Sequence, residues 1–429
     1  MNAPDDLGRA ARPGDARALP AFAAHGIELE YAVVRRDSLD VDAAAPRILR
    51  ALAGLPDTAP APQNVRVGDL AWSNELIAHV IEVKNESPGA LEGLGRRFHA
   101  EVLAMIRRIE PLGLRLMPGG MHPWMHPRQG ELWSFGGSAI YRAYDRIFGC
   151  SGHGWANLQS MHLNLPFRGD AEFARLHAAA RLIVPILPAL AASSPYVEGE
   201  AAPNLDHRME VYRSNAGAVP LVTGLVVPDT YASRGQYERD LLLPMYREIA
   251  PHDPEGALQN EWLNGRGVIA RFDRSALEVR VMDAQECPQM DVALGALASD
   301  AIRWLYEGQA GALAAQQALS TERLSAIFLA CVRDAERAPI RDRDYLALLG
   351  VDRAECRAAE LWQRLSEDMD ARGTPHRAVW GSGLTFILSR GTLARRLLKA
   401  AGAAPRIDTL REVYRALADC LEQGRAFDP

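Results

Sequence analysis

The chain has 429 residues and a mass of 46.9 kDa, which is too long for a peptide module and typical of one large domain or two closely packed ones. Its hydrophobic fraction of 48% and net charge of -6 describe an ordinary soluble globular protein. This charge balance lacks the basic excess that sequence-independent nucleic-acid binding requires. No segment approaches the run of about 20 apolar residues that spans a bilayer. We therefore expect neither nucleic acid nor a membrane as a partner.

The cysteines and the first residues indicate a reducing compartment. The five cysteines lack CxxC spacing, and their odd number fits free thiols better than a disulfide framework. The first two dozen residues mix Asp, Arg and Pro with Ala and show no apolar core typical of a signal peptide. We therefore expect a cytoplasmic protein.

Before residue 285, strand-like and helical segments follow one another irregularly. Strands are predicted over residues 26–34, 75–84, 114–118, 159–166 and 276–283. Apolar residues at helical spacing predict helices over 89–110, 170–192 and 235–249. A parallel sheet would need βαβ units at regular intervals, so this order favours an α+β fold around a largely antiparallel sheet.

Residues 289–426 have helical periodicity throughout. Breaks between helices are predicted at Gly308 and Gly311, at Ala338-Pro339, at Gly350, and at Gly381 and Gly383. We expect three regions: a flexible N-terminal extension (1–24), a catalytic α+β core (25–288), and a helical C-terminal region packed on that core (289–429).

The first predicted strand places two carboxylates on one face. Glu28 and Glu30 alternate with Ile27, Leu29 and Tyr31, so the carboxylates project together about 6.6 Å apart. Two like charges this close are unfavourable unless a cation lies between them. The alternative is the solvated face of an edge strand, because acidic side chains are mostly exposed.

The same pattern recurs in two later strands. His162 and Asn164 share the polar face of one strand, and Glu278 and Arg280 share the polar face of the other. Apolar residues form the opposite face of both strands. Three strands with apolar backs therefore present side chains that can bind a metal ion or a phosphate.

The predicted strand 75–84 adds Glu75 and Glu82. Glu82 lies among apolar residues, whereas Glu75 is equally well explained as a surface residue of a helix or turn. Carboxylates with a single imidazole suit Mg²⁺ or Mn²⁺ better than a structural zinc ion. Hard oxygen ligands beside an arginine indicate metal-bound phosphate chemistry. A P-loop or dinucleotide-binding domain is not supported, since neither glycine motif occurs.

At these residues the chain resembles the glutamate–cysteine ligase superfamily, the carboxylate–amine ligases with a glutamine-synthetase-like fold. The similar segments are 26–30 (GIELE), Glu75 with Glu82, 120–123 (GMHP), 192–195 (ASSP) and 277–283 (LEVRVMD), with a looser echo in 391–394 (GTLA). The match in 277–283 is the most specific. Many relatives have His-x-His where this chain has His162-Leu163-Asn164, so an amide takes the place of the second imidazole.

The resemblance implies roles for particular residues. Two or three Mg²⁺ ions (or Mn²⁺) would be held against the phosphates of ATP by Glu28, Glu30, Glu75, Glu82, His162 and Glu278. Glu278 and Arg280 would be catalytic, with Arg280 stabilising the transferring phosphoryl group. Arg208 and Arg271 would bind the substrate carboxylate in bidentate geometry, although arginines in such segments are more often surface ion-pair partners. His122 would line the site, with a structural loop hydrogen bond as the alternative.

The implied function is an ATP-dependent carboxylate–amine ligase that forms an amide from small-molecule substrates through an acyl phosphate. One alternative is a metal-dependent amide hydrolase, in which His162 and the carboxylates activate water. Another is a non-catalytic relative that binds a nucleotide or amino acid, against which the acidic set and Arg280 argue.

A homo-oligomer is compatible with the sequence. Four tryptophans are interpreted as core or loop anchors: Trp124, Trp133, Trp155 and Trp262.

Overall fold

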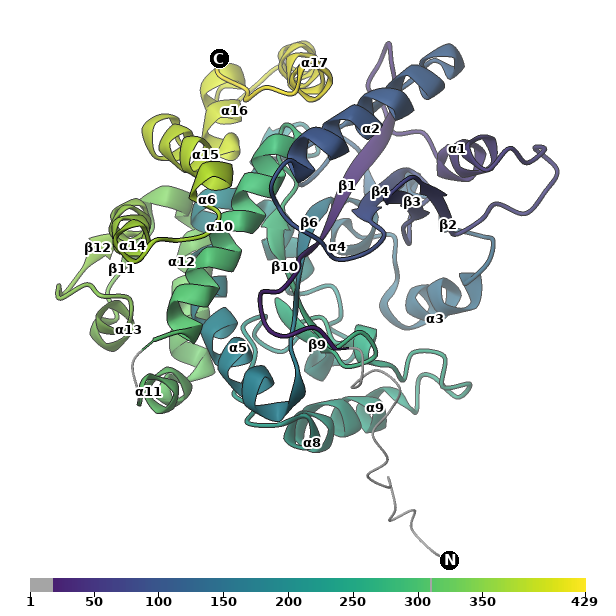
Figure 1. Ribbon diagram of the computed structural model, residues 1–429. Helices are drawn as coiled ribbons and strands as arrows, with labels where there is room; N and C mark the ends of the chain where they lie inside the picture. Colours follow the sequence, from purple (N-terminus) through teal and green to yellow (C-terminus); the bar gives the residue numbers. More distant parts are fainter. Residues whose placement is uncertain (1–17, 309–310) are drawn as a thin grey trace, which may run out of the picture.

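The computed structural model describes residues 18–308 and 311–429 and is built around one large sheet (Figure 1). The strand order is β2-β3-β4-β1-β6-β10-β9, with β5 also paired to β1, and all neighbouring strands are antiparallel. The strands are β1 (Gly26–Arg35), β2 (Asn64–Val67), β3 (Leu70–Asn74), β4 (Val80–Asn85), β5 (Leu114–Met117), β6 (Ser160–Pro166), β9 (Val268–Arg271) and β10 (Ala276–Asp283). Two small ribbons join β7 (Tyr196–Val197) to β8 (Glu200–Ala201) and β11 (Pro339–Ile340) to β12 (Cys356–Arg357). The α+β prediction with a largely antiparallel sheet is confirmed.

The described chain also contains helices before and after the last strand of the large sheet. Those before the last sheet strand are α1 (Ala45–Leu52), α2 (Leu94–Ile109), α3 (Ser138–Phe148), α4 (His153–Ala156), α5 (Gly169–Ile183), α6 (Pro188–Ala191), α7 (His207–Tyr212), α8 (Arg234–Tyr237) and α9 (Leu243–Ile249). Those after it are α10 (Pro288–Tyr306), α11 (Ala312–Ala318), α12 (Thr321–Asp334), α13 (Arg343–Leu348), α14 (Ala358–Arg372), α15 (Arg377–Arg390), α16 (Leu393–Ala401) and α17 (Ile407–Gln423). The helix predicted over 170–192 is divided into α5 and α6 by a short 3-10 turn that contains Pro185.

The strand predicted over 75–84 is wrong in its first half. Residues 75–79 form the connection between β3 and β4, and β4 begins only at Val80. The backbone of Val80 donates to Ile77 O within this connection, and that of Val33 in β1 donates to His79 O. The connection therefore packs against β1 and places Glu75 beside the sheet.

The helix break predicted at Gly381 and Gly383 is also wrong, because α15 runs through both residues. A Cβ atom added at Gly383 would lie 3.1 Å from Ala293 Cβ on α10. Gly383 therefore lets α10 and α15 pack closely, which is a tertiary role that a reading of local propensity does not detect.

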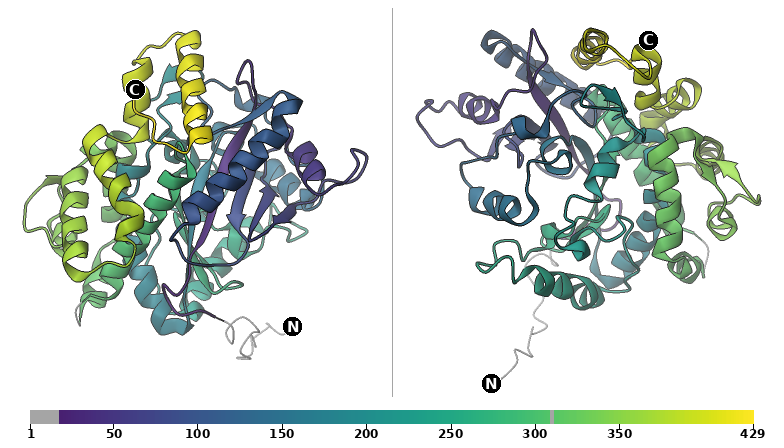
Figure 2. Two further views of the ribbon diagram at one scale, coloured as in Figure 1. Left: turned by 45° about the horizontal axis from the view of Figure 1, so that its top comes forward. Right: turned by 180° about the vertical axis from the view of Figure 1, so that it is seen from behind.

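One face of the sheet carries the hydrophobic core. Helices α2, α5 and α10 pack together over this face, with α14 and α15 packed on α10 (Figure 1). Figure 2 shows α2 lying across the strands with the C-terminal helices beside it. Ile27, Leu29, Leu163 and Val279 are fully buried here. Burying each such side chain contributes about 1.5–3 kcal/mol to the stability of the fold. The apolar residues therefore keep one face of these strands against the core, and the polar residues that alternate with them lie on the opposite face.

The N-terminal extension is described only in part. Residues 1–17 lie outside the described residues, so the expectation of flexibility there stays a prediction. At Ala18 the carbonyl accepts hydrogen bonds from Arg168, and Ala21 N donates to Glu172. In 18–308 and 311–429, no helix has both the length and the apolar character of a membrane span.

Candidate active site

The polar face of the sheet forms the floor of a cavity of about 730 Å³. Its lining includes nine of the ten residues predicted for the site: Glu28, Glu30, Glu75, Glu82, His162, Arg208, Arg271, Glu278 and Arg280. These residues come from β1, β4, β6, β9, β10, α7 and the β3–β4 connection. Segments as far apart in sequence as Glu28 and Arg280 therefore supply one concave, charged surface.

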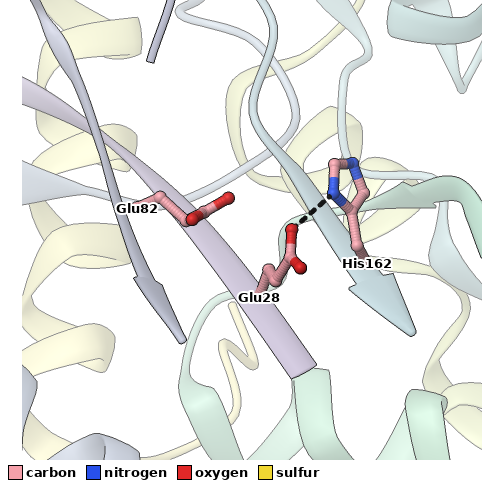
Figure 3. Close-up of side chains that lie close together, drawn as sticks. All are labelled: Glu28, Glu82 and His162. Carbon is pink, nitrogen blue, oxygen red and sulfur yellow. Dashed lines mark hydrogen bonds and ion pairs between the residues drawn. The ribbon is translucent and has the colours of Figure 1, made fainter. Parts of the chain in front are cut away.

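Strand register explains how the carboxylates meet. Glu28 on β1 lies directly opposite His162 on β6 and Lys84 on β4. Two residues further along β1, Glu30 lies directly opposite Glu82. Figure 3 shows Glu28, Glu82 and His162 converging from three neighbouring strands.

Hydrogen bonds fix His162 between the first two carboxylates. His162 Nδ1 lies 3.2 Å from Glu28 Oε2, and Nε2 lies 2.9 Å from Ser160 Oγ (Figure 3). Ser160 donates its backbone N–H to Glu30 at 2.7 Å. Burial alone would raise the pKa of Glu28, but the bond with His162 brings it well below its usual range. Asn164, which stands in place of a second histidine, donates to Glu28 Oε1 at 3.1 Å.

Two sets of side chains are arranged to hold a cation. In one set the donor atoms of Glu28, Glu82 and His162 lie within 4.8 Å of one another, and in the other those of Glu30, Glu75 and Glu82 do so. Burial raises the pKa of Glu75 and Glu82, and the neighbouring carboxylates raise both further. Oxygen donors with one imidazole fit a hard divalent ion such as Mg²⁺ or Mn²⁺.

Glu278 lies between two arginines. Its Oε2 accepts a hydrogen bond from Arg271 Nη1 at 3.0 Å, and Arg280 Nε lies 3.1 Å from Oε1 as an ion pair. The register between β10 and β6 shifts between Val279 and Met282, and the backbone of Arg280 donates to Gly267 O instead of to β6. Arg280 lines the cavity from the same strand face as Glu278, two residues along.

Behind the cavity, three of the family-like segments meet at Asp283. Its carboxylate accepts from the backbone of Ser193 and the hydroxyl of Ser194, both at 2.8 Å. A Cβ atom at Gly120 would lie 2.4 Å from the Asp283 carboxyl carbon, so this contact requires glycine. Arg208 is only 2% exposed and donates its Nε to Asp283. Arg208 thus reaches the cavity wall while its Nε–H is bonded to the interior.

The structure does not bring His122 to the cavity. Its Nε2 lies 2.8 Å from Leu39 O, and its Nδ1 accepts from the backbone of Met125 at 3.0 Å. Burial lowers the pKa of His122 to about 4, so the ring is neutral. His122 therefore fits the alternative interpretation, a loop histidine with structural hydrogen bonds, because both of its ring nitrogens contact backbone groups.

Sequence reasoning missed several residues of the cavity. Lys84 is on the same strand face as Glu82, two residues along, so the alternation already visible for Glu28 and Glu30 predicts its position. Trp155 and Trp262 line the cavity with Tyr144, whose ring centroid lies 5.1 and 6.0 Å from theirs. The interpretation of these two tryptophans as core or loop anchors overlooked an aromatic wall, for which the sequence offers no local signal.

Comparisons with known proteins agree with this geometry. An uncharacterized protein of Archaeoglobus fulgidus is 38% identical over 237 residues, which is 54% of this chain and 62% of that protein. The chain thus spans less than two thirds of that relative. A glutamate–cysteine ligase from Francisella tularensis, solved in complex with AMP, has a similar structure with a TM-score of 0.64 and 13% identity, over 93% of this chain and 88% of that one.

A bifunctional glutathione synthetase from Pasteurella multocida also shares the fold, with a TM-score of 0.51 and 16% identity over 92% of this chain and 52% of that one. The model of glutamate-cysteine ligase family 2 matches residues 24–411. This range includes every strand of the acidic cavity and most of the C-terminal helices. The chain therefore belongs to glutamate-cysteine ligase family 2.

Proposed function

We propose that this chain is an ATP-dependent carboxylate–amine ligase that forms an amide through an acyl phosphate. The observation that carries the proposal is the convergence of Glu28, Glu30, Glu82, His162 and Arg280 on one cavity from adjacent strands, in a member of this family. The AMP complex of the Francisella tularensis enzyme supports an adenine nucleotide as substrate.

The reaction has two steps. A carboxylate oxygen of the first substrate attacks the γ-phosphorus of ATP, and the bond to ADP breaks. The amine nitrogen of the second substrate then attacks the acyl carbon, inorganic phosphate leaves, and the nitrogen loses a proton. The first step is needed because a carboxylate is a poor electrophile at neutral pH.

The acidic residues of the cavity are proposed to hold the metal ions. They are Glu28, Glu30, Glu75, Glu82, His162 and Glu278. Bound Mg²⁺ supplies neutralisation and orientation of the phosphate oxygens. This proposal accounts for buried carboxylates whose charges repel one another in the absence of a cation.

The arginines are proposed to divide the remaining tasks. Arg280, held by Glu278, presents its guanidinium to the charge that develops on the transferring phosphoryl group. Arg271, the second partner of Glu278, is proposed to bind the substrate carboxylate. Arg208, which donates its Nε–H to Asp283, is proposed to support this wall and to share in binding the substrate carboxylate.

The test is an assay of ADP release with Mg²⁺ across a panel of amino-acid carboxylates and amines, with mass spectrometry of the products. We expect ADP, phosphate and a new amide in equal amounts for at least one pair. Glu30→Gln should abolish this release, whereas Glu200→Gln, at an exposed position in β8, should not. Cleavage of amides without ATP would replace the proposal with a hydrolase, and nucleotide binding without turnover for any pair would replace it with a non-catalytic role.

A further inference from the structure

The chain contains 48 lysines and arginines together, of which only Lys84 and Lys399 are lysines. Lys399 is exposed on α16 and donates to the carbonyl of Pro429. Lys84 instead lies in the acidic cavity. A chain that uses arginine almost everywhere thus places a compact ammonium group, rather than a planar guanidinium, among its carboxylates.

Contacts hold the Lys84 ammonium against Glu82. Its Nζ lies 2.7 Å from Glu82 Oε1 and 2.9 Å from Ser73 Oγ. Ser73 Oγ also donates to the same Glu82 oxygen at 2.7 Å. On the neighbouring strand, Glu28 lies directly opposite Lys84. The ammonium therefore sits where the negative charges of β1 and β4 meet.

This position restricts how Glu82 can bind metal ions. Both donor sets, Glu28/Glu82/His162 and Glu30/Glu75/Glu82, depend on an oxygen of Glu82. Because Oε1 already accepts from an ammonium and a hydroxyl, only Oε2 remains for a metal ion. A carboxylate can bridge two metal ions in two ways: each oxygen binds one ion, or both ions share one oxygen at close range. The Lys84 ammonium opposes both arrangements, because it repels a second positive charge near Glu82.

We propose that Lys84 is a built-in cation of the acidic centre, a positioning residue that holds Glu82 Oε1 and limits the two donor sets to one divalent ion at a time. The inference rests on the proposed function, because it concerns the metal ions that the ligase would use. Lys84 performs part of the charge neutralisation that a second ion would otherwise supply. Its side chain is 30% exposed, so cavity water reaches it and its loss leaves no buried void.

The test is a titration of the metal-free full chain with Mn²⁺, without nucleotide, followed by electron paramagnetic resonance. We expect the wild type to bind one Mn²⁺ tightly. Lys84→Met should bind a second ion, with the spectrum of a spin-coupled pair, since a neighbouring positive charge is gone. Lys84→Arg should resemble the wild type, and Lys399→Met is the matched control.

An unchanged number of Mn²⁺ ions in Lys84→Met would overturn the inference, and so would two Mn²⁺ ions bound by the wild type. Circular dichroism melts check the fold, and Lys84→Gln repeats the titration if the Met variant is unstable. The readout needs neither ATP nor turnover. Altered Mn²⁺ binding without any ligase activity would therefore remove the proposed function alone, whereas unaltered binding in an active ligase would remove the role of Lys84 alone.

Discussion

Glu30 and Glu82 face each other directly across the β1–β4 ladder, 6% and 4% exposed. Like charges at directly opposite positions of a sheet destabilise it, and burial strengthens their repulsion. Lys84 and Ser73 contact Glu82 directly, whereas the backbone N–H of Ser160 bonds Glu30. The fold therefore contains an unfavourable contact that the proposed metal ion would relieve.

We therefore expect Glu30→Gln to change thermal stability in opposite directions without and with Mg²⁺. The metal-free variant should unfold at a higher temperature than the wild type, because the repulsion is gone while an oxygen remains to accept from Ser160. Mg²⁺ should then stabilise the variant much less. The wild type should gain about 2.7 kcal/mol when Mg²⁺ is at 100 times its dissociation constant. Thermal melts with chelator and with Mg²⁺ measure both effects, and a less stable metal-free variant would contradict the argument.

Arg280→Lys tests the proposed catalytic arginine. An ammonium cannot reproduce the planar fork of a guanidinium, so turnover should fall about 100–1,000-fold, the usual loss for one transition-state donor. The melting temperature should change little, because Arg280 lines the cavity and Glu278 keeps its bond to Arg271. Arg239→Lys, at an exposed ion pair, is the control. Normal turnover with a lowered melting temperature would assign Arg280 to a structural ion pair.

The sequence predicted those parts of the sheet that consecutive residues specify. Alternation in 26–34 and 276–283 places carboxylates on one face and apolar residues on the other, whatever the partner strands are. The strands β2, β3 and β9 were missed. They have only four or five residues each, and their extended conformation depends on ladder partners rather than on a local pattern.

Strand alternation predicts which face carries Glu28, Glu30, His162, Glu278 and Arg280, and that face lines the cavity, but it does not predict where side chains in connections and loops point. Glu75 lines the cavity from a connection, although a strand was predicted for it. His122 has the right chemistry but turns toward Leu39, a contact 83 residues distant in sequence. The convergence of three segments on Asp283 also depends on tertiary structure, although each segment could be found by its resemblance.

We expect Asp300 on α10 to stabilise the packing of the C-terminal helices. Its carboxylate accepts from His376 Nδ1 and Trp380 Nε1, both at 2.7 Å, and these residues lie at the start of α15. Asp300→Ala removes the acceptor from two buried donors and should cost about 1–3 kcal/mol for each donor left without a partner. Urea unfolding measures the change. A loss below about 1 kcal/mol, the value of an exposed pair, would show that α15 is held by apolar packing alone.

The pH dependence of that bond follows from Asp300 itself. Burial would raise the pKa of Asp300, but the hydrogen bonds from His376 and Trp380 hold it below its usual range. A carboxyl whose folded pKa is lowered stabilises the fold above its unfolded pKa, and this stabilisation is lost as the pH falls through the folded value. The effect of Asp300→Ala should therefore shrink in acid, below about pH 4.

His177 is a buried histidine that does not line the cavity. It is 0% exposed, neither ring nitrogen has a hydrogen-bond partner in the described part of the chain, and the ring packs against Phe173, Tyr231 and Tyr237. Burial, with a smaller contribution from Arg181, lowers the pKa of His177 to about 3. Between that value and the unfolded pKa of 6.5, only the unfolded chain binds the proton, so stability rises with pH across this window.

His177→Phe removes this proton linkage while keeping an aromatic ring of similar size. We compare the free energy of unfolding of the variant with that of the wild type at each pH. This difference should favour the variant by about 2 kcal/mol more at pH 5 than at pH 8, because pH 5 lies roughly 1.5 units below the unfolded pKa. Urea unfolding at a series of pH values measures the difference, and His252→Gln, at an exposed position, should leave the pH profile unchanged. Parallel profiles for the wild type and His177→Phe would mean that His177 is protonated in the folded protein and has a partner inside the aromatic cluster.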